Sequence, residues 1–243
     1  MATVQNPANV TATNCHTDAK PYTPVQLSRA SRKPSLRSKG SLRGAFVIPG
    51  ELRQILVESR IEKTCALWLS TLSDVVQLDD QPAAVHFVRP DGTLNQHTFD
   101  FLAHFSNGRR IFFAVKDEAR AVKYDAMGFL AHIAPQIPKS RADGVMLYTE
   151  RTISPAAQHN ASLFHAVQRD REHPADAVVG DVIATIQGAV QIADIVRASG
   201  YGALAFRAVV RLIQQRVLLL TADERIDYAT RVTVAARHIG EGA

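Results

Sequence analysis

The most constraining feature of this 243-residue sequence is a strand–helix–strand pattern near its middle. Ile111–Val115 is almost wholly apolar, Glu118–Ile133 has apolar residues at helical spacing, and Val145–Tyr148 is a second apolar run. Two buried strands joined by a helix predict a parallel pair with a right-handed crossover. A crossover of this kind covers a sheet face with helices, so the pattern predicts an α/β fold.

Shorter segments with strand character precede this unit. They are, in chain order, Val75–Leu78, Ala83–Val88 and His97–Phe105. A Pro-Asp-Gly turn at residues 90–92 and an Asn-Gly turn at residues 107–108 follow the last two of them. Turns of this composition join antiparallel strands, so we expect the last two segments and Arg110–Lys116 to form a meander.

A helix with one apolar face is predicted ahead of these strands. Apolar residues recur at helical spacing from Leu52 to Leu72, and Ser73 and Asp74 end the pattern. With the helix that ends before Pro135, it would cover the strands. The core is therefore predicted to be a mixed sheet flanked by helices.

The chain divides into three parts by composition. Residues 1–44 are rich in Thr, Asn, Ser, Pro and Ala without apolar periodicity, so we expect a disordered arm. Residues 45–174 hold the predicted sheet. In residues 175–243 a glycine-containing turn separates two helices, which is typical of a helix-turn-helix. The helical patterns there are Val178–Ile186, Val190–Ala198 and Ala203–Gln215, and two short runs could form a wing, Arg216–Leu220 and Arg231–Val234.

The positive charge of the chain is concentrated in the arm. The net charge is +5, and residues 1–44 hold seven of the 28 Lys and Arg against one acidic residue, Asp18. Such a segment can bind phosphates by counterion release, or it can simply be solvated. The candidates for DNA contact are Arg32, Lys33, Arg37, Lys39 and Arg43.

Several classes of protein are disfavoured by composition. No run of 18 apolar residues is present, so we expect no membrane span. No apolar segment follows the first basic residues, so we expect no secretory signal. The two cysteines, Cys15 and Cys65, offer neither a disulfide framework nor a cysteine zinc site, which favours a reducing cytoplasm.

Three charged residues occupy positions that suit metal-dependent phosphodiester chemistry. Glu62 lies on the apolar-faced helix, Asp100 interrupts a strand between aromatic residues, and Lys116 ends the most hydrophobic strand. Carboxylates hold Mg²⁺ or Mn²⁺ through oxygen, and a lysine can stabilise developing negative charge. Each residue also has a plainer interpretation, because Glu62 and Lys116 could be solvated and Asp100 could pair with Lys116 across neighbouring strands.

Ordered motifs along the chain resemble the TnsA-type transposon endonucleases. Glu58-Ser59-Arg60-Ile61-Glu62 matches an E-S-x-x-E helix, and Gln81-Pro82 a Q-P turn. Residues 97–102 match the family's Y-T-P-D-F-L, and Ala114-Val115-Lys116 aligns with its E-V-K or Q-V-K. The resemblance spans residues 40–235, and its remaining motifs are Val75-Val76, Tyr148-Thr149-Glu150 with Ile153 and Asn160, and Val210–Ile213.

The resemblance implies a restriction-endonuclease-like fold with a small winged-helix-like C-terminal domain. It implies a nuclease that nicks double-stranded DNA at the 5′ ends of a bacterial transposon. Its partners would be a DDE transposase, which cuts and joins the 3′ ends, and an AAA+ regulator ATPase. Carried over by position, Glu62, Asp100 and the Val115 backbone carbonyl would ligate Mg²⁺ or Mn²⁺, and Lys116 would assist attack by water.

Two positions depart from the family pattern. Phe99 replaces the proline before the aspartate, which extended geometry tolerates. Ala114 replaces a Glu or Gln that would face the same side as Lys116 and offer an oxygen to the metal. Glu58, one turn before Glu62, could supply a carboxylate instead, although a solvated Glu58 is the preferred interpretation.

Three hypotheses follow from these residues. The first is an active TnsA-like endonuclease with weakened metal binding. The second, favoured by Ala114, is a degenerate nuclease fold that serves as a DNA-binding or assembly subunit. The third is a nuclease of the same fold in restriction, repair or phage processing. In residues 175–243 seven basic and seven acidic residues balance, so protein docking there is as plausible as DNA reading, with Arg207 and Arg211 either contacting phosphate or solvated.

Overall fold

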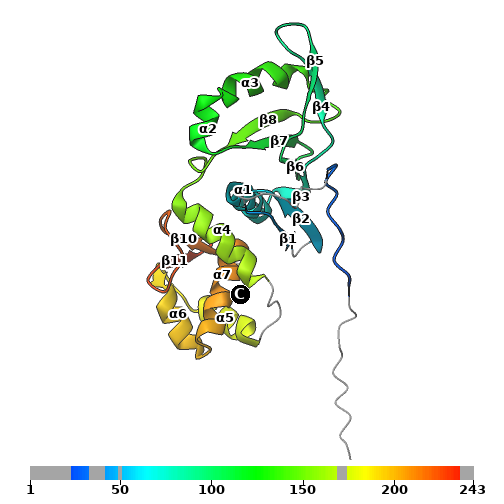
Figure 1. Ribbon diagram of the computed structural model, residues 1–243. Helices are drawn as coiled ribbons and strands as arrows, with labels where there is room; N and C mark the ends of the chain where they lie inside the picture. Colours follow the sequence, from blue (N-terminus) through cyan, green and yellow to red (C-terminus); the bar gives the residue numbers. More distant parts are fainter. Residues whose placement is uncertain (1–22, 33–41, 49–50, 169–173, 236–243) are drawn as a thin grey trace, which may run out of the picture.

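The computed structural model describes residues 23–32, 42–48, 51–168 and 174–235 (Figure 1). It has an α/β architecture, as expected from the sequence. A four-stranded sheet with helices on both faces forms one part, and a mainly helical unit with a small sheet forms the other. No helix in these ranges is long and apolar enough to cross a membrane.

The central sheet contains β3 (Val75–Asp80), β6 (Phe101–Phe105), β7 (Arg110–Val115) and β8 (Gly144–Tyr148), in the order β3-β6-β7-β8. The β3–β6 and β6–β7 pairs are antiparallel and the β7–β8 pair is parallel. The parallel pair predicted from the strand–helix–strand pattern is therefore confirmed.

The connection from β7 to β8 contains two helices rather than the single helix predicted for residues 118–133. These are α2 (Glu118–Lys123) and α3 (Ala126–Ile133), followed by a 3₁₀ turn at Ala134–Gln136. Asp125 breaks the helix because its backbone is left-handed, with φ 44°, and its side chain accepts a hydrogen bond from the Gly128 amide. Asp at an N-cap satisfies an amide that the first turn leaves unpaired.

Two apolar cores lie on opposite faces of the sheet. Phe113 and Val115 point toward α1 (Arg60–Thr71), and Phe112 and Ala114 point toward α3. Figure 1 shows α2 and α3 above the sheet and α1 below it. This alternation follows from the two-residue period of a strand.

The predicted three-strand meander is wrong in one respect. β4 (Val85–Val88) and β5 (Leu94–His97) form a separate antiparallel hairpin, and β5 does not continue into β6. The chain bends at Asp100, and the His97 ring packs edge-on against Phe99 with ring centroids 4.7 Å apart. The turn residues predicted each hairpin, but they carried no information about this interruption.

The prediction of a helix from Leu52 onward is also wrong at its beginning. Residues Arg53–Val57 form β2, which pairs with β1 (Gly44–Ile48) in an antiparallel hairpin. The side chains of β2 alternate between buried and partly buried, and this is the period of a strand. Helix α1 begins at Arg60, after its N-cap Ser59.

Residues 23–32 form a segment that we call the strap, which requires a correction to the expected disorder of residues 1–44. The Gln26 amide donates to the Leu52 carbonyl and the Gln54 amide donates to the Gln26 carbonyl, so the strap adds a parallel bridge beside β2. Figure 1 shows it in blue alongside β2. The other residues of the expected arm up to Ser41 lie outside the described ranges.

The C-terminal unit is built from α4 (Pro155–Val167), α5 (Pro174–Ala184), α6 (Ile192–Ser199) and α7 (Ala203–Gln214), with three short strands. The strands β9 (Val190–Gln191), β10 (Leu218–Leu220) and β11 (Arg231–Val234) pair antiparallel in the order β10-β11-β9. The three helices and two later strands predicted from the sequence are therefore present.

Helix α4 joins the two parts of the molecule. Val167 at its end belongs to the C-terminal core. The Asn160 side chain donates to the Glu224 carbonyl and accepts from the Ile226 amide, which fixes the β10–β11 loop to α4. The C-terminal core therefore begins before residue 175.

Candidate active site

Glu62, Asp100 and Lys116 come together at one end of the sheet. Glu62 is in the first turn of α1, Asp100 is at the bend before β6, and Lys116 follows β7. Asp100 and Lys116 are neighbours because the Val115 amide donates a 2.7 Å hydrogen bond to Asp100 Oδ2. Glu62 is close enough that the Asp100 charge raises its pKa.

The Asp100 carboxylate is held in a partly buried position with an elevated pKa. Burial raises this pKa most, and the Lys116 charge, the Val115 amide and the Arg32 charge each lower it. Glu58 raises it further. An acid with this balance carries its negative charge at a free-energy cost that a nearby cation would relieve.

Glu62 has a structural role as well as a candidate catalytic one. Its Oε1 accepts a hydrogen bond from Ser59 Oγ and its Oε2 accepts a 2.6 Å bond from the Glu58 amide. Ser59 in turn accepts from the Glu62 amide, so the two form a capping box. The Ser-x-x-Glu spacing could have indicated this role from the sequence. Burial and the nearby Asp100 nevertheless raise the Glu62 pKa, so capping does not fully compensate its charge.

Lys116 presents its side chain to solvent beside the two carboxylates. Its backbone amide donates to the Tyr148 carbonyl, which fixes the main chain at the end of β7. Its ammonium group makes no hydrogen bond or ion pair with any residue that the structure describes. A long, exposed cation next to buried acids can reach an approaching anion.

The Val115 carbonyl lies on the same side of β7 as Asp100. The amide and carbonyl of one strand residue point toward the same neighbouring strand, and the Val115 amide reaches Asp100. The carbonyl is therefore directed to the edge that carries the Asp100 carboxylate.

Ala114 contributes no oxygen atom to this site. Its side chain is 4% exposed and belongs to the apolar cluster on the α3 face, together with Phe112 and Leu130. The methyl group therefore packs in the apolar core beside the site.

The preferred interpretation of Glu58 as a solvated helix residue is wrong. Glu58 precedes the N-cap Ser59, so it lies outside α1. Its side chain is mostly buried and accepts a 3.2 Å hydrogen bond from Arg32 Nη2. Its charge raises the pKa of both Glu62 and Asp100, so it is part of the acidic cluster.

The donor set suits a hard divalent cation that keeps several water molecules. Two carboxylates and a carbonyl are oxygen ligands, and Mg²⁺ is typically held by one or two carboxylates with water and substrate phosphate. In the described ranges no three His, Cys, Asp or Glu side chains converge closely enough to form a complete cage. Glu58 influences the two acids through its charge.

His97 was not singled out from the sequence. It ends β5, and its ring packs between Phe99 and Phe129. Burial lowers its pKa, and the Lys116 charge lowers it further, so the imidazole is neutral at neutral pH. Its position beside Lys116 depends on the bend at Asp100, which local sequence patterns did not predict.

No protein-family model and no curated protein matches this chain.

The candidate DNA-contacting residues of the arm do not share one environment. Arg32 is exposed and lies at the acidic cluster. Arg43 is partly buried, and its Nε and Nη1 atoms are enclosed without hydrogen-bond partners in the described ranges, so it is not a freely solvated arm residue. Lys33, Arg37 and Lys39 fall outside those ranges.

Arg207 and Arg211 do not form an exposed stripe on α7. Arg211 is buried, donates to the Val167 carbonyl and pairs with Asp176, and Arg207 donates to the Ala166 carbonyl. Both guanidinium groups thus bind the C-terminal end of α4, where carbonyl oxygens lack helical partners. For Arg211, both expectations, contact with phosphate and solvation, are therefore wrong. The Arg207 guanidinium is hydrogen-bonded to α4.

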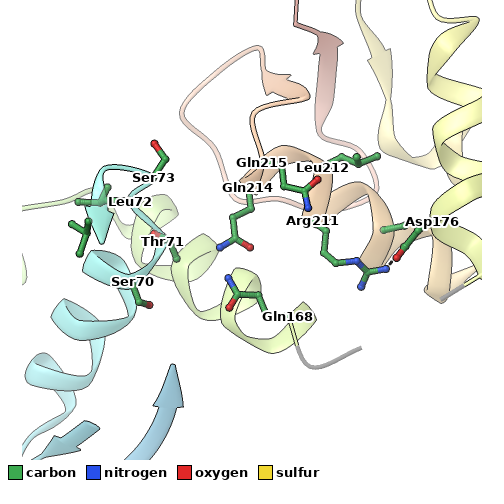
Figure 2. Close-up of a pocket in the computed structure, with 12 residues that line it drawn as sticks. Ser70, Thr71, Leu72, Ser73, Gln168, Asp176, Arg211, Leu212, Gln214 and Gln215 are labelled. Atoms are coloured by element: carbon green, nitrogen blue, oxygen red, sulfur yellow. Dashed lines mark hydrogen bonds and ion pairs between the residues drawn. The ribbon is translucent and has the colours of Figure 1, made fainter. Parts of the chain in front are cut away.

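A polar cavity of about 590 Å³ lies between the end of α1 and the C-terminal unit. Figure 2 shows Gln168, Gln214 and Thr71 facing one another across it, with the Arg211–Asp176 pair at one side. Glu62 and Ser70 are eight residues apart on α1, which is roughly 12 Å along a helix. The cavity is thus separate from the acidic cluster. Asp176 is the one carboxylate among the residues that line it, and it pairs with Arg211, so we place the candidate active site at Glu62, Asp100 and Lys116.

Proposed function

We propose that this chain is a TnsA-like subunit of a heteromeric transposase, a metal-dependent DNA endonuclease that nicks the 5′ ends of a transposon. The observation that carries the proposal is the meeting of two acids of raised pKa with an exposed lysine that has no ion-pair partner among the residues the structure describes. Strongly perturbed pKa values cluster at active sites, where burial and like charges are brought together.

The residues of the cluster have separable roles in this reaction. Glu62, Asp100 and the Val115 carbonyl would hold Mg²⁺ or Mn²⁺, which when bound would supply Lewis-acid activation of the phosphate and of an attacking water. Lys116 approaches the scissile phosphate from solvent and stabilises the negative charge that develops on its oxygens. The Val115 amide donates to Asp100 Oδ2 and so orients the carboxylate, including its other oxygen, Oδ1.

The arrangement of secondary structure supports the proposed fold assignments. A mixed sheet with the acid before one central strand and the lysine after the next agrees with a restriction-endonuclease-like core. In the C-terminal unit, the order α5, β9, α6, α7, β10, β11 with β9 paired to β11 agrees with a winged-helix-like domain. Because α7 is buried for most of its length, we propose that this domain docks a protein partner rather than reads DNA.

The partners in this proposal are double-stranded DNA at the transposon ends, a DDE transposase and an AAA+ regulator ATPase, in the bacterial cytoplasm. A nuclease of the same fold in restriction, repair or phage processing remains the competing biological setting. A neighbouring gene for a DDE transposase and one for an AAA+ ATPase would favour transposition, and their absence would favour the competing setting.

A second candidate function is favoured by Ala114. Because position 114 offers only a buried methyl group, the cation would have one anionic ligand fewer than in the family pattern. The chain would then be a degenerate nuclease fold that serves as a DNA-binding or assembly subunit of the transposition complex.

Cleavage assays distinguish the two functions. The full chain is incubated with paired transposon ends or supercoiled plasmid, Mn²⁺ and the cognate transposase. Nicking that is abolished by Asp100→Ala and retained by Asp91→Ala supports the nuclease, because Asp91 is an exposed hairpin carboxylate that accepts hydrogen bonds from Thr93. Binding to DNA or transposase without nicking supports the assembly subunit and contradicts the nuclease.

A further inference from the structure

The strap carries two arginines that differ in what they contact. Arg29 and Arg32 are equally exposed, at 55% of their side chains. Arg29 lies 3.9 Å from Asp79 of β3, whereas Arg32 pairs at 3.2 Å with Glu58 of the acidic cluster. The Arg32 charge also lowers the pKa of Asp100.

The strap is anchored tightly enough to fix where Arg32 lies. Ser28 Oγ donates a 2.6 Å hydrogen bond to Asp80 Oδ2, and Asp80 is fully buried beside Arg53. A charge-assisted bond to a buried carboxylate is among the stronger anchors available to a short segment.

A second anchor connects the strap to Asp100 itself. The Ser31 amide donates to the Gln81 carbonyl at 2.9 Å, and the Gln81 amide donates to the Asp100 carbonyl at 2.8 Å. Gln81 is buried and has a left-handed backbone, with φ 40°, so it is held in one conformation by these bonds. Gln81 thus links Ser31 to Asp100 through two backbone hydrogen bonds. Arg32 is the next residue after Ser31, so these bonds hold its backbone close to Asp100.

We propose that Arg32 is the phosphate-binding residue of the candidate active site, and that it exchanges its partner Glu58 for a DNA phosphate when DNA binds. This inference rests on the proposed function and assigns to one arm residue a place within the site. A guanidinium group suits the task because it binds a phosphate through two parallel hydrogen bonds, as it binds a carboxylate.

In this exchange, Arg32 affects the affinity for a divalent cation and the affinity for DNA in opposite directions. Without DNA, the Arg32 charge beside Glu58 and Asp100 opposes the arrival of a divalent cation. With DNA, the guanidinium moves to a phosphate oxygen, and the repulsion toward the cation falls while a contact to DNA is gained. Removal of Arg32 therefore strengthens cation binding and weakens DNA binding. Loss of a purely structural ion pair could produce the first effect through its charge, but it would not remove a contact to a DNA phosphate.

The test compares Arg32→Ala with Arg29→Ala in the full chain. Mn²⁺ affinity is measured without DNA, and binding of a DNA duplex is measured in EDTA over a range of salt. We expect Arg32→Ala to bind Mn²⁺ about two- to fivefold more tightly, the effect of one solvent-exposed charge pair. We expect its salt slope for DNA to fall by about one, the loss of one phosphate contact.

The control variants define the outcomes. Arg29→Ala should leave Mn²⁺ affinity unchanged, and Arg32→Lys should restore it while recovering only part of the DNA affinity. Unchanged Mn²⁺ affinity or an unchanged salt slope in Arg32→Ala, with normal binding by the unsubstituted protein, would overturn this inference alone. If the unsubstituted protein binds neither ligand, the proposed function fails and this inference fails with it.

Discussion

A glutamate at position 114 tests the geometry of the candidate cation site. Ala114 is 4% exposed among apolar side chains, so an unpaired carboxylate there is costly. We expect Ala114→Glu to lose about 2 kcal/mol of stability without metal, which lowers the melting temperature by about 6 °C for a protein of this size. Position 114 and Lys116 project from the same face of the strand. A cation bound at Asp100 can therefore pair with the new carboxylate and reduce this loss of stability.

Thermal unfolding with and without Mn²⁺ measures this effect. If the added ligand tightens Mn²⁺ binding tenfold, saturating Mn²⁺ recovers about 1.4 kcal/mol of the lost stability. The matched control is Ala103→Glu, since Ala103 is fully buried on β6 but belongs to the cluster on the α1 face. Mn²⁺ should not restore the stability of this control. Equal recovery in both variants, or recovery in neither, would refute the geometric reasoning about position 114.

Two further predictions concern the acids and their surroundings. Ser59→Ala removes the N-cap of α1, so we expect urea unfolding to show a free energy of unfolding lower by about 1 kcal/mol. Ser154→Ala, at the N-cap of α4, should cost a similar amount. Only Ser59→Ala should also weaken Mn²⁺ binding. The pKa of Asp100 is raised in the folded state, so its contribution to stability is present below the unfolded pKa and is lost as pH rises through the folded pKa. Asp100→Asn should therefore be more stable than the unsubstituted protein at pH 7, with a difference that shrinks toward pH 4; a difference independent of pH would contradict this cause.

The parallel pair of strands could be predicted because its signal is local. Ile111–Val115 and Val145–Tyr148 are apolar on both faces, which is typical of strands covered on both sides. β2 was missed for a related reason. Its five residues stand directly before a helix, and Leu56 fits the helical spacing of that helix, although the buried side chains of β2 alternate with the period of a strand.

The candidate site depended on contacts that local patterns do not encode. The positions of Glu62, Asp100 and Lys116 in the predicted helix and strands single them out as a candidate site, but those positions equally suit solvated residues or an ion pair. The family resemblance is what favours the site. The Arg32–Glu58 contact spans 26 residues and depends on the anchoring of the strap at Asp80 and Gln81. Composition favoured a disordered arm because it does not show that Asp80 is buried within reach of Ser28.

The roles of two arginines in the C-terminal unit could not be predicted from local sequence patterns either. Arg207 and Arg211 are one turn apart, and helical spacing predicts that they share a face. Spacing does not say that this face packs against the end of α4, where Arg211 binds the Val167 carbonyl. Knowledge of the packing between helices was required to separate a docking arginine from one that faces solvent.

The central claim is that Glu62 and Asp100 form one divalent-cation site next to Lys116. It is tested most directly by electron paramagnetic resonance titration of the full chain with Mn²⁺, which measures bound and free metal without any assay of activity. We predict one bound Mn²⁺ per chain, lost in both Glu62→Gln and Asp100→Asn and retained in Asp91→Asn. Mn²⁺ binding that is the same in all four proteins would contradict the account.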